Sequence, residues 1–173
     1  MPDHPRPYLR GYPQALLDKI ELMLDSGQLE KVLAARYPII SSIKTDKQLR
    51  EFVLDLKNTY LKRSGPLSKI CFDDKIELLH DALGLHTYAA RAQGSRTKTK
   101  NELRVASMFT ELPEPFLRMV VAHELAHLKE KEHNKAFYQL CCHIEPNYQQ
   151  LELDLRLHLT VQEQVRKGAG RVG

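Results

Sequence analysis

Two histidines and a glutamate form the part of this sequence best suited to chemistry. Residues 123–127 read H-E-L-A-H, with His123 and His127 four positions apart and Glu124 between them. Side chains with this spacing are neighbours on a helix, with Cβ atoms about 5 to 6 Å apart, so two imidazoles can bind one ion. Because a catalytic zinc usually has three protein ligands and an open position for water, a third ligand is expected nearby.

His133 is the predicted third ligand, on the condition that the helix ends before it. In a continuous helix, His133 would point about 120° away from His127 and lie about 9 Å further along the axis. The intervening segment 129–132 has no apolar residue to bury, and Asn134 is a favourable N-cap for a following helix. We therefore expect His133 at a turn between two helices, where its side chain can fold back.

This combination of residues predicts a zinc-dependent hydrolase. Zinc lowers the pKa of its bound water to about 7, and Glu124 can take the proton as the hydroxide attacks a carbonyl. Both motif histidines lie in an otherwise apolar helix, where unpaired polar groups are costly, so a metal site is favoured over a purely structural role. We predict a metallopeptidase that acts on a protein or peptide substrate.

The longer run HELAHLKEKEHNKAFYQLCCHIEPNY resembles the YgjP-like metallopeptidase family. That family's signature is H-E-L-x-H-x5-H, followed by a capping residue, an aromatic pair and Pro-x-Tyr; the matching positions are His123, Glu124, His127, His133, Phe137, Tyr138, Pro146 and Tyr148. The resemblance covers residues 84–158 and implies a zincin-like fold, in which the metal-site helix packs under a small sheet. In that fold, the candidate strand 85–92 would align an extended peptide by β-augmentation.

Two other families share the histidine spacing. Metzincin proteases place Gly three residues after the second His, where this chain has Glu130, so membership there is not expected. YbeY-type ribonucleases lack the Glu after the first His, so Glu124 favours the peptidase. The basic segment 91–104 keeps a metal-dependent ribonuclease as an alternative, and also a nucleic-acid-associated protein with structural zinc. Its candidate nucleic-acid-binding residues are Arg91, Arg96, Lys98 and Lys100.

The surrounding pattern predicts an α+β fold in two parts. Gly65-Pro66 separates an N-terminal helical lobe, residues 1–65, from a zincin-like domain, residues 66–173. The lobe has helical spacing in 13–27, where Gly27 can close the helix, in 28–37 and from Thr45 or Asp46 to Gly65. The second part offers strands near 68–72, 85–92 and 102–109, of which the last two should form an antiparallel pair with a basic tip. The predicted sheet is small and mainly antiparallel.

Composition supports a folded domain. Apolar residues make up 42% and charged residues 28% of the 173 residues, and the net charge is only +4. No apolar stretch is long enough to span a bilayer, and the N-terminal segment has no secretory pattern. Three cysteines, an odd number, indicate reduced thiols. We expect a cytoplasmic protein that does not associate with membranes.

Other polar residues have simpler interpretations. His143 lies close to Cys141 and Cys142 in the sequence, and the three residues could form a rival metal-binding group. Buried cysteines are commonly core residues, so this alternative is not favoured. His86 and His158 could reach a cleft as proton donors, although structural roles are more usual for isolated histidines. Tyr138 could likewise reach a cleft, although a structural role is again more usual.

Overall fold

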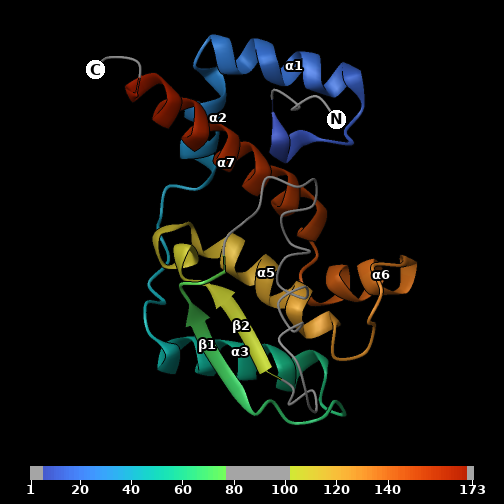
Figure 1. The fold of residues 1–173 in the computed structure, drawn as a ribbon. Helices are drawn as coiled ribbons and strands as arrows, with labels where there is room; N and C mark the ends of the chain where they lie inside the picture. The colour runs from blue at the N-terminus through green and yellow to red at the C-terminus, as the bar shows by residue number, and fades with distance from the viewer. Residues whose placement is uncertain (1–5, 77–101, 171–173) are drawn as a thin grey trace. The chain divides into compact units, whose positions relative to one another are not determined.

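The computed structural model describes residues 6–76 and 102–170 and divides the chain into two compact units. Unit 1 comprises Met1–Pro38, Leu79–Gly84 and Glu152–Gly173, and unit 2 comprises Ile39–Leu78 and Leu85–Leu151. The described elements are helices and a two-stranded sheet, which confirms the α+β class (Figure 1). Within the described residues, no helix has the length and apolar character to cross a membrane.

Helices form the core of unit 1. It contains a 3-10 turn at Pro7–Leu9, α1 (Gln14–Asp25), α2 (Gln28–Arg36) and most of α7 (Tyr148–Ala169). Gly27 joins α1 to α2 with a φ of 70°, a left-handed conformation that glycine adopts without strain. The buried core of this unit consists of Leu9, Ile20, Leu24, Leu29, Leu33 and Leu157.

A buried carboxylate links α2 to α7 within unit 1. Asp154 is 1% exposed and accepts hydrogen bonds from the Arg36 guanidinium at 2.7 Å and the Tyr37 hydroxyl at 2.5 Å. Burial, together with the bond to Asp154, raises the pKa of Tyr37. The end of α2 is therefore fixed to α7 by a charge-assisted contact rather than by apolar packing alone.

Unit 2 places helices against a parallel strand pair. It contains α3 (Asp46–Tyr60), β1 (Lys69–Asp73), β2 (Glu102–Ala106), a 3-10 turn at Ser107–Glu111, α5 (Glu114–Ala126), α6 (Lys135–Ile144) and the first turn of α7. Helix α3 contacts β1, and α5 contacts both β2 and α6. The chain from α5 to α6 contains the three histidines of the predicted metal site.

The direction of the sheet corrects the sequence-based prediction. Strands β1 and β2 are parallel, with Cys71 opposite Arg104, so the expectation of a mainly antiparallel sheet is wrong for the described strands. The strand predicted at 85–92, on which the antiparallel pair depended, lies outside the described residues. The segment between β1 and β2 is long enough for the crossover of about a dozen residues that parallel pairing requires.

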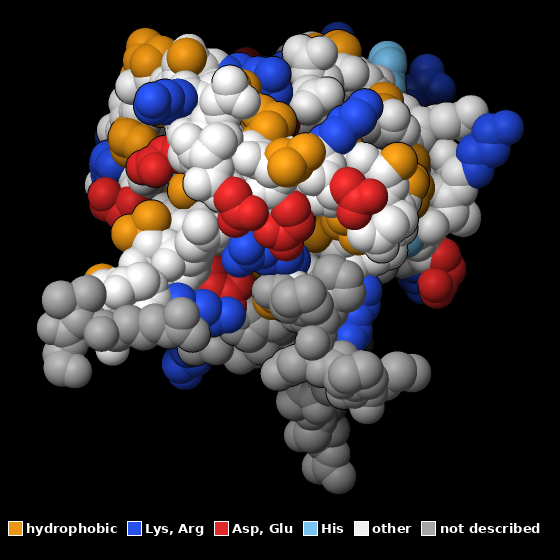
Figure 2. Space-filling model, turned by 90° about the horizontal axis from the view of Figure 1, so that it is seen from above, with side chains coloured by type: hydrophobic (Ala, Val, Ile, Leu, Met, Phe, Trp, Pro, Cys, Tyr) orange, Lys and Arg blue, Asp and Glu red, His pale blue; other side chains and the backbone are white. Residues whose placement is uncertain are grey.

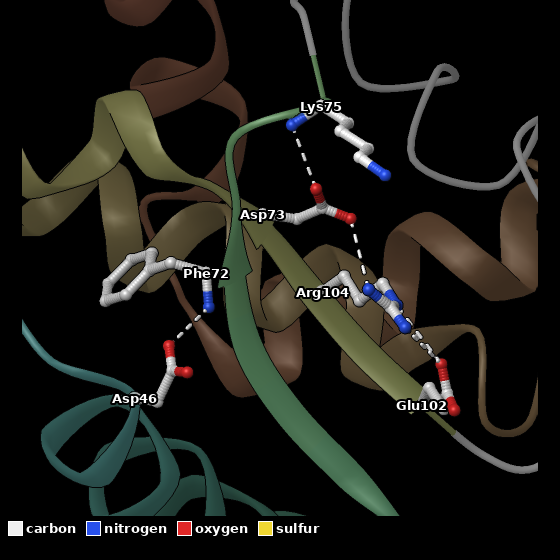
Figure 3. Close-up of polar contacts among 6 residues, drawn as sticks. All are labelled: Asp46, Phe72, Asp73, Lys75, Glu102 and Arg104. Carbon is white, nitrogen blue, oxygen red and sulfur yellow. Dashed lines mark hydrogen bonds and ion pairs between the residues drawn. The ribbon is translucent and has the colours of Figure 1, made fainter.

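Polar contacts connect α3, β1 and β2 (Figure 3). The Asp46 carboxylate, in the first turn of α3, accepts a hydrogen bond of 2.8 Å from the Phe72 amide of β1. Arg104 on β2 donates to Asp73 on β1 at 3.2 Å and to Glu102 on its own strand at 3.0 Å. One arginine thus bridges the two strands, while α3 is attached to the edge of β1.

Helix α5 is the most deeply buried helix segment of unit 2. It starts after Pro113 and has Pro115 within its first turn, where a missing amide proton costs nothing. Residues on every side of it are buried: Phe116, Leu117, Met119, Val120, Val121, Ala122, His123, Leu125 and Ala126. This burial agrees with the apolar composition of the helix that contains the motif, and close packing of this kind holds side chains in fixed positions.

Several large hydrophobic side chains of the described residues are exposed, among them the adjacent Ile39 and Ile40. Leu22, Ile39 and Val165 are 72%, 76% and 58% exposed. On the face shown in Figure 2, hydrophobic side chains are interspersed with Lys, Arg, Asp and Glu. Single exposed apolar residues of this kind are normal on protein surfaces.

Candidate metal centre

The chain turns sharply between the second and third histidines of the site. Helix α5 ends at Ala126 and is followed by His127 as its C-cap, so the H-E-x-x-H motif occupies its last turn. Helix α6 begins after Asn134, whose side chain accepts a 2.9 Å hydrogen bond from the Phe137 amide. The predicted helix break before His133 and the predicted Asn134 cap are both confirmed.

The turn brings three imidazole nitrogens together. His133 Nε2 lies 3.3 Å from His123 Nε2 and 3.0 Å from His127 Nε2. A tetrahedral zinc with Zn–N bonds of about 2.0–2.1 Å has ligand nitrogens separated by about 3.3 Å. The donor type and spacing therefore fit a single metal ion. Among the described residues, this is the one cluster of His, Cys, Asp and Glu side chains with ligand spacing.

Contacts on the far side of two rings orient their Nε2 atoms toward the cluster. His127 Nδ1 lies 3.0 Å from the Glu130 carbonyl oxygen, which only accepts, so Nδ1 carries the proton and Nε2 has a free lone pair. His123 Nδ1 lies 2.8 Å from the Tyr148 hydroxyl. Sequence reasoning missed both partners. Every residue has a backbone carbonyl, so residue type does not indicate the contact of His127. The Pro-x-Tyr pattern includes Tyr148 without indicating what Tyr148 contacts.

A buried aromatic ring fixes all three imidazoles. Phe137 is fully buried, and its ring centroid lies 4.8 Å from that of His123, 4.6 Å from that of His127 and 4.7 Å from that of His133. Tyr138 follows it in α6 and is partly buried, with its ring 6.4 Å from that of His133. The packing restricts rotation of the histidines, which favours a preformed site.

Glu124, the residue after His123 in the chain, supplies an acidic group. Its Oε1 atom is buried and accepts no hydrogen bond from the described residues, although the residue as a whole is partly exposed. Burial raises the pKa of Glu124 to about 8. A nearby cation would favour the ionised form of such a carboxylate.

The other candidate residues lie apart from this cluster or outside the described residues. His143 is exposed and packs edge-on against Tyr60, with ring centroids 5.4 Å apart, so it is not part of the histidine cluster. His158 belongs to unit 1, where its Nε2 lies 3.1 Å from Gln162 Nε2. The predicted nucleic-acid contacts Arg91, Arg96, Lys98 and Lys100, and also His86, fall outside the described residues.

Comparison with known proteins gives two matches. The YgjP-like family, described as "YgjP-like, metallopeptidase domain", matches residues 85–158. A protein of Escherichia coli (strain K12) named UTP pyrophosphatase is 56% identical over 153 residues, which cover 88% of this chain and 92% of that protein. No solved structure shows a significant match.

Fold, site and matches together support an enzyme, a metal-dependent hydrolase. The chain belongs to the YgjP-like family, as the resemblance predicted.

The predictions of a peptidase and of a peptide substrate are wrong, because the 56% identical relative is named as a nucleotide hydrolase. The physical reason is that a metal-activated water would not by itself select the atom attacked. A carbonyl carbon and a phosphorus atom are both open to such a nucleophile.

Proposed function

We propose that this protein is a metal-dependent nucleotide pyrophosphatase that hydrolyses UTP to UMP and diphosphate. The convergence of three imidazole Nε2 atoms is the observation that carries this proposal. The choice of substrate is supported by the relative named UTP pyrophosphatase, with which this chain shares 56% identity over nearly its whole length.

In this proposal, His123, His127 and His133 bind the ion through Nε2, and the ion is zinc. Three imidazoles with a fourth position left for water are a typical ligand set for catalytic zinc. When bound, the ion lowers the pKa of a coordinated water and offsets negative charge on the phosphoryl oxygens. Phe137 and the Glu130 carbonyl keep the rings in place during turnover.

Glu124 acts in this proposal as the base that accepts a proton from the attacking water. Its Oε1 is suited to this role because Glu124 directly follows His123 in the chain, and because the atom is buried and accepts no hydrogen bond from the described residues. The reaction forms one P–O bond to the water oxygen and breaks one P–O bond of the anhydride. The proton taken by Glu124 can then pass to the diphosphate leaving group.

The cytoplasmic location predicted from the sequence remains part of this proposal. It is supported by the odd number of cysteines in the sequence, Cys71, Cys141 and Cys142.

The proposal is tested by comparing zinc-loaded parent protein with the Glu124→Gln variant. We expect the parent to release UMP and diphosphate from UTP, and the variant to be slower by about 10²- to 10⁴-fold, the usual contribution of a general base. Zinc content should remain stoichiometric in both. Glu132→Gln is the matched control, because Glu132 is exposed in the turn between α5 and α6 and should retain full activity.

Products are separated by ion-exchange chromatography, and zinc is measured by mass spectrometry. If zinc-loaded parent leaves UTP and the other ribonucleoside triphosphates intact, the proposed activity is rejected. Full activity of Glu124→Gln rejects only the role of Glu124. Hydrolysis in ¹⁸O-labelled water then identifies the attacked phosphorus, since the label enters either UMP or diphosphate.

A further inference from the structure

The hydroxyl of Tyr148 lies directly behind one histidine of the candidate metal centre. It is 2.8 Å from Nδ1 of His123, and the two rings are nearly parallel, with an interplanar angle of 16°. Tyr148 is fully buried and His123 is 2% exposed. The contact joins two helices, because His123 lies on α5 and Tyr148 is the first residue of α7.

This contact matters because of the proton that a metal-binding imidazole must carry. A neutral histidine that binds through Nε2 has its proton on Nδ1, and that N–H group needs an acceptor. At His123 the burial of the ring excludes bulk water from this role, and the Tyr148 oxygen is within hydrogen-bonding distance. At His127 the corresponding partner is the Glu130 carbonyl, which side-chain substitution does not remove.

We propose that Tyr148 is a positioning residue of the metal centre, which holds His123 in the Nδ1-protonated form and thereby sets the affinity of the site for its ion. The inference rests on the proposed metal site but not on the proposed substrate. Tyr148 acts through His123 and is not a ligand itself, since it faces the nitrogen on the opposite side of the ring from the cluster.

The test is the metal affinity of Tyr148→Phe, measured by competition for zinc with a chromophoric chelator. The substitution removes one oxygen and keeps the ring, and we expect zinc to bind about 10- to 100-fold more weakly, as for other outer partners of metal ligands. Tyr60→Phe is the matched control. Tyr60 also contacts a histidine ring, that of His143, but Tyr60 lies outside the cluster. Removal of the Tyr60 hydroxyl should therefore change zinc affinity less than twofold.

A second measurement needs no variant and therefore does not depend on the folding of Tyr148→Phe. Long-range ¹H–¹⁵N spectra of the zinc-loaded parent, labelled at its histidines, report which nitrogen of His123 carries the proton. We expect a protonated Nδ1. A proton on Nε2 overturns the inference, as does a zinc affinity of folded Tyr148→Phe within twofold of the parent, or equal weakening in Tyr60→Phe.

The His123→Ala variant separates this inference from the proposed site. If His123→Ala binds zinc as tightly as the parent, the proposed site itself is rejected. If His123→Ala loses zinc while Tyr148→Phe keeps the parental affinity, the site stands and only the positioning role of Tyr148 is rejected.

Discussion

At the candidate metal centre, each histidine is held by a different kind of contact. His123 faces a tyrosine hydroxyl, His127 faces a backbone carbonyl, and His133 lies in a turn where it packs against Phe137. A carbonyl partner depends on the path of the chain, whereas a hydroxyl partner depends on one side chain. Substitutions around the cluster should therefore act mainly through the ligands themselves, Phe137 and Tyr148.

Removing His133 should show whether the turn between α5 and α6 supplies a metal ligand. We expect His133→Ala to bind zinc more than about 100-fold more weakly, because even an outer partner of a ligand contributes about 10- to 100-fold. Hydrolysis of UTP should be lost with the metal. The measurement is zinc content after dialysis, together with competition against a chelator.

His143→Ala is the control for that experiment, since His143 is exposed and packs against Tyr60 away from the cluster. It should keep parental zinc content. Stoichiometric zinc in dialysed His133→Ala, or its loss from His143→Ala, would contradict the proposed ligand set.

Sequence reasoning identified the clustered residues but not what surrounds them. The spacing of His123 and His127 is a local property of one helix, and the polar run before His133 indicated the break. The Tyr148 contact spans 25 positions and two helices, so no local pattern indicates it. The sequence also could not indicate which atom of the substrate is attacked, because a metal-activated water can attack either a carbonyl carbon or a phosphorus atom.

At the scale of elements, local sequence patterns predicted the ends of helices better than they predicted the direction of the strands. Asn134 caps α6, and Thr45 forms a complete capping box with Gln48 at the start of α3, as side chains of these types do at helix ends. Helix α3 stops at Tyr60 rather than continuing to Gly65, and the next residue, Leu61, is 1% exposed. Burial of Leu61 and the parallel direction of the strands are tertiary effects that short sequence patterns do not encode.

The capping box predicts a measurable contribution to the stability of α3. The Thr45 side chain accepts a 3.2 Å hydrogen bond from the Gln48 amide, and Gln48 accepts one from the Thr45 amide. Thr45→Ala should lower the free energy of unfolding by about 1 kcal/mol, the usual effect of losing an N-cap. The readout is the midpoint of urea unfolding followed by circular dichroism.

Thr59→Ala is the matched control within the same helix. Thr59 is exposed near the end of α3, and its hydroxyl donates to the Asp55 carbonyl, which is already an intrahelical acceptor. Its replacement should change stability by less than about 0.5 kcal/mol, as at most surface positions. Equal losses in the two variants would mean that the cap contributes nothing specific.

At the scale of the whole molecule, the question is which elements form a cooperative unit with the metal site. All three clustered histidines belong to unit 2, and so does α3, which contacts β1. The boundary predicted at Gly65-Pro66 instead groups α3 with α1 and α2. That boundary remains a prediction, and metal binding offers a way to test it.

Zinc should slow hydrogen exchange in unit 2 while leaving α1 and α2 unchanged. A ligand that binds only the folded state stabilises it by about 2.7 kcal/mol at 100 times its Kd. This stabilisation slows hydrogen exchange in every segment that unfolds cooperatively with the metal site. We expect added protection in α3, α5 and α6, measured by mass spectrometry of exchanged peptides with and without zinc. His133→Ala, which should not retain the metal, is expected to show no difference.

Helix α3 is the discriminating segment in that experiment. Protection of α3 together with α5 supports unit 2 as the cooperative unit, because the hydrogen bond that the Phe72 amide of β1 donates to Asp46 of α3 is broken when β1 unfolds. Unchanged exchange in α3 alongside slower exchange in α5 would instead favour the division at residue 65. Equal protection of α1 and α5 would contradict both divisions, since the chain would then unfold as one body.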